Sequence, residues 1–131
     1  MLIYTTILKE MKYMATPQLD FSSIQVRDLE KSREFYQNTL GFEIENENPG
    51  AYVFKNEKGA SFAIRKPLVD LDRAGKLGWG VALWFSVPDV EKRYEDVRGK
   101  EVKIVKDLTD SPFGKVFTVE DPDGYYITFH G

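Results

Sequence analysis

A chain of 131 residues with 42 % hydrophobic and 30 % charged residues has the composition of one soluble globular domain. Its net charge of −3 and pI near 5.2 exclude the basic surface of a typical nucleic-acid-binding protein, so we expect no nucleic-acid partner. The absence of cysteine excludes disulfides and thiolate chemistry and agrees with a cytoplasmic location. No apolar run approaches the ~20 residues of a membrane-spanning helix, so we expect no membrane partner.

The N-terminal residues read differently from the remainder of the chain. Residues 1–12 begin apolar, but they lack the basic start and the small-residue cleavage site of a signal peptide. Met14 and the Ala-Thr-Pro after it resemble a natural beginning of a domain. We therefore interpret residues 1–18 as an N-terminal extension and residues 19–131 as a single domain.

The first half of the domain, residues 19–66, is predicted to contain a strand, a helix and three further strands. Alternating apolar residues predict a strand at 19–26, and Asp28 is a suitable N-cap for the helix that follows. Gly41 stands where a helix C-cap is wanted. The three further strands are predicted at residues 42–45, 51–55 and 60–65.

The second half, residues 79–131, repeats this order after a linker at residues 67–78. Residues 24–31 (Ile-Gln-Val-Arg-Asp-Leu-Glu-Lys) and 85–92 (Phe-Ser-Val-Pro-Asp-Val-Glu-Lys) are closely similar. A helix is predicted from Asp89 through Val97, with four strands at residues 81–87, 102–105, 115–119 and 125–130. The duplication predicts an α+β fold of two pseudo-symmetric βαβββ modules, which form a cupped, mixed, mostly antiparallel sheet around one cavity.

Strand side chains alternate between faces, which divides the predicted sheet into an apolar face and a mixed face. The apolar face should lie against the helices and comprises Ile24, Val26, Phe62, Ile64, Leu83, Phe85, Val87, Ile127 and Phe129. The mixed face comprises Phe21, Ser23, Gln25, Ser61, Ala63, Arg65, Ala82, Trp84, Ser86, Tyr126, Thr128 and His130. A mixed concave face is typical of a small-molecule pocket, although a second core or a dimer contact would have the same composition.

Two stretches of the chain resemble a known family. The stretch from Phe21 to Phe42 resembles the opening, and that from Ser111 to Phe129 the end, of the vicinal oxygen chelate domain. That superfamily contains glyoxalase I, the extradiol dioxygenases, fosfomycin-resistance transferases and bleomycin-resistance proteins. The resemblance spans residues 19–130 and implies paired βαβββ modules that form a cup, usually completed in a homodimer.

Enzymes of this family hold a divalent metal, and the resemblance places the ligand positions at Phe21, Ala63, Ala82 and Thr128. Phe and Ala have no donor atom, and a neutral Thr hydroxyl is a poor ligand, whereas a catalytic divalent site needs about three N or O ligands. A register shift by one residue would offer Asp20 or His130, but it would disturb the strand alternation. We therefore predict no metal and no other cofactor.

No catalytic residue is assigned either, because the sequence has no Gly-x-Ser-x-Gly nucleophile elbow and no glycine-rich phosphate loop before a helix. The resemblance to metal-free, bleomycin-resistance-like members implies binding without catalysis. We expect an aromatic or amphipathic, antibiotic-like ligand in the cup between the modules. The expected ligand-binding residues are Phe21, Ser23, Gln25, Arg65, Trp84, Tyr126, Thr128 and His130. The alternatives are a metal-dependent lyase or dioxygenase with non-standard ligands, and a protein-interaction module with a vestigial cavity.

Overall fold

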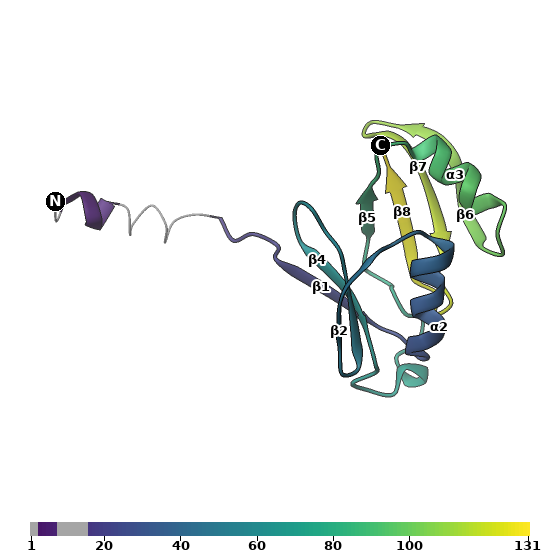
Figure 1. Ribbon diagram of the computed structural model, residues 1–131, viewed down its shortest axis with the longest axis horizontal. Coiled ribbons are helices and arrows are strands. Elements are labelled where there is room, and N and C mark those ends of the chain that lie inside the picture. The colour runs from purple at the N-terminus through teal and green to yellow at the C-terminus, as the bar shows by residue number, and fades with distance from the viewer. Residues whose placement is uncertain (1–2, 8–15) are drawn as a thin grey trace.

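The computed structural model describes residues 3–7 and 16–131, and it contains the duplicated βαβββ unit (Figure 1). The first module has β1 (Phe21–Gln25), α2 (Leu29–Glu34), a π-helical segment η1 (Phe35–Thr39), β2 (Ile44–Asn48), β3 (Ala51–Phe54) and β4 (Ser61–Arg65). The short helix η2 (Leu71–Arg73) lies between the modules. The second has β5 (Leu83–Ser86), α3 (Val90–Arg98), β6 (Lys103–Ser111), β7 (Gly114–Glu120) and β8 (Tyr126–His130). The predicted fold class is confirmed.

The eight strands form two four-stranded sheets rather than one continuous sheet. Sheet 1 has the order β1-β4-β3-β2, and sheet 2 has the order β5-β8-β7-β6. In each sheet the first pair is parallel and the other two pairs are antiparallel, so the internal repeat extends to the pairing. Figure 1 shows the two sheets side by side, with α2 next to the turn between β7 and β8.

Local sequence explains where α2 and α3 begin. The Asp28 carboxylate accepts a hydrogen bond from the Lys31 amide at 3.1 Å, and the Asp89 carboxylate accepts one from the Lys92 amide at 3.1 Å. Both carboxylates therefore satisfy an amide that the first helical turn leaves without a partner. Gly41 has a φ of +85°, a left-handed conformation that glycine adopts without a steric penalty, and the chain leaves the helix there.

The prediction for β6 was too short. The strand continues to Ser111 and turns tightly through Pro112 and Phe113, whereas it was predicted to end at residue 105. The register shifts twice along β6, between Ile104 and Lys106 and again before Thr109. Each shift breaks the period-two alternation on which the prediction depends, and so the polar second half of the strand was not recognised.

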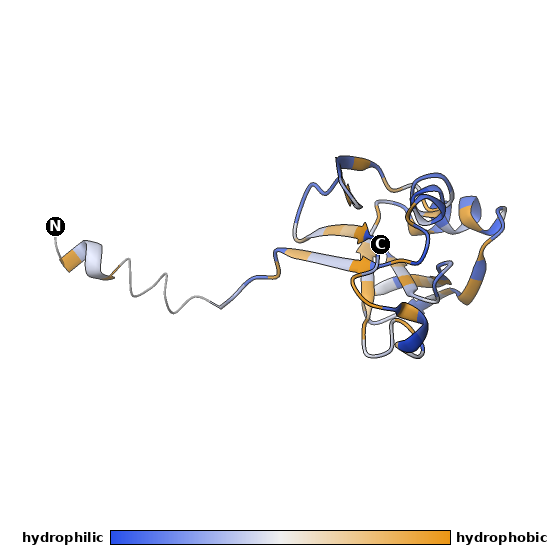
Figure 2. Cartoon of the chain, turned by 90° about the horizontal axis from the view of Figure 1, so that it is seen from below, coloured by the Kyte–Doolittle hydropathy of each residue, from blue (hydrophilic) through white to orange (hydrophobic). Residues whose placement is uncertain are grey.

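One hydrophobic core lies between the two sheets and their helices. The predicted apolar face is confirmed, since Ile24, Ile64, Ile127 and Phe129 are all buried. Rings from the two modules meet there: Phe62 and Phe85 have centroids 5.1 Å apart, and Phe42 and Phe129 have centroids 6.1 Å apart. The apolar faces of both sheets are therefore turned toward a shared interior. Figure 2 shows the alternation of hydrophobic and hydrophilic residues along the strands that produces these faces.

The opposite face of each sheet carries the mixed residues, and we call these two surfaces the outer faces. Aromatic rings on them are open to solvent: Phe21 is 51 % exposed, Trp84 46 % and Tyr126 42 %. Among the described residues, no helix is long and apolar enough to cross a membrane.

Candidate ligand-binding site

The outer face of sheet 2 carries an aromatic cluster. Trp84 on β5 and His130 on β8 have ring centroids 5.8 Å apart. Phe113, at the turn between β6 and β7, meets the Trp84 ring edge-on at 5.9 Å. Phe113 is 72 % exposed, so it borders the cluster rather than filling a core. Sequence reasoning missed this residue; an aromatic side chain between Pro112 and Gly114 was the available signal.

Strand register places polar groups beside these rings. Trp84, Thr128, Thr118 and Lys106 stand in one row across β5, β8, β7 and β6. Thr128 is mostly buried, and its hydroxyl shares a 2.7 Å hydrogen bond with the Thr118 hydroxyl. On the neighbouring row, the Lys76 ammonium from the linker lies over the Tyr126 ring, 5.6 Å from its centroid. This is within the range of a cation–π contact.

The outer face of sheet 1 holds the other half of the predicted residues. Phe21 and Ser23 are exposed, and Arg65 is half-buried. Gln25 already has an internal role: its side-chain oxygen accepts a hydrogen bond from the Leu68 amide at 2.6 Å, and its backbone carbonyl accepts one from the Tyr125 hydroxyl at 2.9 Å. Gln25 therefore ties the linker and the start of β8 to the end of β1.

The chain does not bring the two halves together. In the part of the chain that the structure describes, no hydrogen bond or ring contact joins the outer-face side chains of sheet 1 to those of sheet 2. The eight predicted residues thus form two groups: Phe21, Ser23, Gln25 and Arg65 on sheet 1, and Trp84, Tyr126, Thr128 and His130 on sheet 2.

A cavity of about 750 Å³ lies elsewhere, on the helix side where the modules meet. Phe42, Phe85 and Phe129 line it, and residues 55–58 of the β3–β4 hairpin and Arg93 of α3 lie around it. None of the eight predicted residues lines this cavity. Its rings are already packed against one another, with Phe42 edge-on to Phe85 at 4.9 Å. The outer faces, in contrast, leave ring surfaces free for a flat ligand.

The residues at the family's metal positions do not fit a metal ion. Ala63 is almost fully buried and has no donor atom, and the Thr128 hydroxyl is engaged by Thr118. Over residues 3–7 and 16–131, no three His, Asp or Glu side chains are grouped closely enough to hold an ion. The donor set therefore supplies no divalent metal chemistry at these positions.

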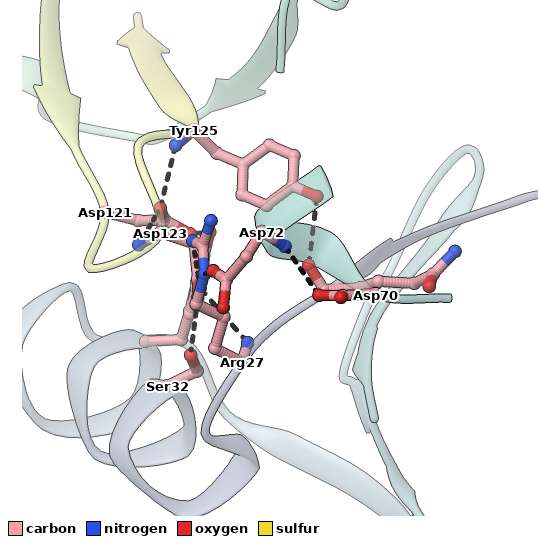
Figure 3. Close-up of polar contacts among 9 residues, drawn as sticks. Arg27, Ser32, Asp70, Asp72, Asp121, Asp123 and Tyr125 are labelled. Carbon is pink, nitrogen blue, oxygen red and sulfur yellow. Dashed lines mark hydrogen bonds and ion pairs between the residues drawn. The ribbon is translucent and has the colours of Figure 1, made fainter. Parts of the chain in front are cut away.

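A polar network joins the two modules at the turn between β7 and β8 (Figure 3). Arg27, after β1, contacts Asp72 of the linker at 2.8 Å and Asp123 of this turn at 3.1 Å. Tyr36 lies in η1, directly after α2, and its hydroxyl donates a 2.8 Å hydrogen bond to the buried carboxylate of Asp121. The network ties module 1, the linker and module 2 at one point, and thereby fixes how the outer faces are oriented.

Burial raises the pKa of Asp121 from 3.8 to about 6, while hydrogen bonds from Tyr36 and from the amides of Tyr125 and Asp123 act in the opposite direction. The folded state thus holds this proton more tightly than the unfolded state. Its contribution to stability is fully present below about pH 4 and is lost as the pH rises through 6.

From this shift we expect that lowering the pH from 7 to 5 stabilises the wild type relative to Asp121→Asn by about 1 kcal/mol. Asn cannot titrate, so the difference between the two proteins isolates this carboxyl from all others. Urea unfolding of both proteins at the two pH values measures it. A difference that stays constant between the two pH values would contradict the assignment.

The sequence is similar to a known protein family and to a characterised relative. The family model described as "Glyoxalase/Bleomycin resistance protein/Dioxygenase superfamily" matches residues 18–129. The phenazine antibiotic resistance protein EhpR of Enterobacter agglomerans is 24 % identical over 116 residues, covering 86 % of this chain and 88 % of that protein.

Solved structures show the same fold. TnmS3, an antibiotic binding protein from Streptomyces sp. CB03234, has a TM-score of 0.72 and 23 % identity, covering 89 % of this chain and 97 % of that one. A superfamily member from Sphaerobacter thermophilus has a TM-score of 0.68 and 25 % identity, covering 87 % and 96 %.

Proposed function

The chain belongs to the Glyoxalase/Bleomycin resistance protein/Dioxygenase superfamily, and we propose that it binds a planar aromatic, antibiotic-like molecule without a metal ion. The observation that carries this proposal is the solvent-open aromatic cluster of Trp84, Phe113 and His130 on the outer face of sheet 2. An exposed indole with an edge-on neighbour offers a flat face on which another ring can stack. The name of the relative EhpR, a phenazine antibiotic resistance protein, supports a planar ligand of this kind.

We further infer that the protein works as a cytoplasmic homodimer. A small ligand in a specific site usually has 70–90 % of its surface buried, at a rough estimate. One outer face covers only one side of a flat ligand, and Phe21 on the other outer face stays 51 % exposed. The outer face of sheet 1 from a second copy would supply the missing wall, with Phe21, Ser23 and Arg65 opposite Trp84 and Tyr126.

The side chains at the metal-ligand positions support binding without metal-dependent catalysis. Metal-dependent lyase or dioxygenase chemistry needs a set of donors at Phe21, Ala63, Ala82 and Thr128, and these residues do not form one. The outer faces can enclose a ligand, stack on it and hydrogen-bond to it. We therefore propose sequestration, in which the bound molecule is withheld from its target, rather than its chemical conversion.

Titration of purified, EDTA-treated protein with phenazine tests this proposal. We expect saturable quenching of tryptophan fluorescence, a melting temperature that EDTA does not change, and a mass by light scattering of about twice 15.1 kDa. Absence of quenching both before and after addition of Zn²⁺ or Mn²⁺ would contradict ligand binding. Quenching that the EDTA-treated protein shows only after Zn²⁺ or Mn²⁺ is added would favour the metal-dependent alternative. A monomeric mass together with saturable quenching would contradict a site that is shared between two copies of the chain.

A further inference from the structure

The outer faces carry a charge opposite to that of the whole protein. The chain has a net charge of −3, with 21 acidic and 18 basic residues. Each sheet contains strand residues that are paired with a neighbouring strand. Of these paired residues, the charged ones on the outer faces are Arg65, Lys103, Lys106 and Glu120. Glu120 is the lone carboxylate in that paired set, and Lys103 neutralises it at 3.1 Å. The acidic side chains of the described strands therefore lie mainly away from the candidate site.

Three cations on or beside the outer faces have no acidic partner among the described residues. In the described part of the chain, Arg65, Lys76 and Lys106 form no ion pair with a carboxylate. Within residues 3–7 and 16–131, the Arg65 guanidinium makes one long hydrogen bond, from Nε to the Lys66 carbonyl at 3.4 Å. The Lys76 ammonium lies over the Tyr126 ring, 5.6 Å from its centroid. An unpaired cation next to apolar rings is an electrostatic feature that a ligand anion can complete.

Strand register places two of these cations on the outer faces, and the third, Lys76, contacts a ring. Lys106 shares its row with Trp84, and neighbouring strands are about 4.8 Å apart, so three strand spacings put roughly 14 Å between the two Cα atoms. Lys76 stands directly over Tyr126. Arg65 pairs with Gln25 across β1 and β4 on the other outer face.

We propose that the outer faces select an anionic ligand, a planar aromatic ring system that carries a carboxylate. The rings bind the flat body by stacking, and Lys76, Lys106 and Arg65 attract the carboxylate. This inference rests on the proposed function and specifies its ligand class. It also gives the linker a role in the site, because Gln25 holds the linker backbone at Leu68 and Lys76 belongs to the same segment.

The test compares phenazine-1-carboxylate with phenazine-1-carboxamide, which keeps the ring system and removes the charge. Calorimetry at pH 7 and low ionic strength should show the carboxylate binding about tenfold tighter. Arg65→Gln, Lys76→Gln and Lys106→Gln should each reduce that ratio about twofold to fivefold, because each removes one positive charge that only the carboxylate requires. Added salt should also reduce the ratio, because exposed charges are screened.

Lys92→Gln provides the matched control, since Lys92 is an exposed lysine on α3 and the substitution removes the same charge. The ratio should stay at the wild-type value. Equal affinity of the wild type for the two compounds would overturn the inference and leave the proposed function intact. A preference for the carboxylate that survives all three outer-face variants would overturn the assignment to these residues. Binding of neither compound would contradict the proposed function itself, and the inference with it.

Discussion

Phe129→Ala is expected to lower the free energy of unfolding by about 3–5 kcal/mol. Phe129 is 2 % exposed and stands where the two modules meet. The rings of Phe42, Phe85 and Phe117 surround it, with centroids 6.1, 6.1 and 5.2 Å away. Removing its ring leaves a cavity with walls from both modules, Phe42 from the first and Phe85 and Phe117 from the second, so neither module can close it alone. Urea unfolding at one fixed protein concentration measures the loss.

Phe113→Ala is the matched control for this substitution, because it makes the same chemical change at a residue that is 72 % exposed. Its cost should stay below about 1 kcal/mol, since little buried surface is lost. Comparable losses for the two variants would mean that the apolar faces of the sheets are not the principal core. The contrast therefore tests the division into an interior and two outer faces on which the candidate site depends.

That division was predictable because strand alternation is local and strict. Ile24 and Ile127 are buried and Trp84 is exposed, as the period of two requires. The N-caps at Asp28 and Asp89 were predictable for the same reason, since a cap involves residues only three positions apart. Where β6 departs from regular pairing, its side chains no longer alternate with a period of two. The second half of that strand was therefore not predicted.

Long-range placement could not be predicted from the sequence. Tyr36 and Asp121 are far apart in the chain, and no spacing rule predicts their hydrogen bond. Gln25 was expected to face a ligand, and the structure shows its side chain bound to the linker amide of Leu68. Membership of the mixed face is a property of each strand alone, whereas the separation of Phe21 from Trp84 depends on how whole modules pack. The ligand-binding roles of the eight residues stay predictions.

Trp84→Ala is expected to weaken phenazine binding by ~1–3 kcal/mol, which is about fivefold to 150-fold in Kd. The indole is 46 % exposed and contacts Phe113 and His130 rather than the core, so the melting temperature of the free protein should change little. Trp84→Phe should lose less affinity, because a flat apolar ring remains. Calorimetry is the appropriate readout, since both substitutions remove one of the two tryptophans. A loss of stability of about 3–5 kcal/mol at unchanged affinity would assign Trp84 to packing instead. In that case the aromatic cluster would be structural, and the proposed binding surface on sheet 2 would have to be abandoned.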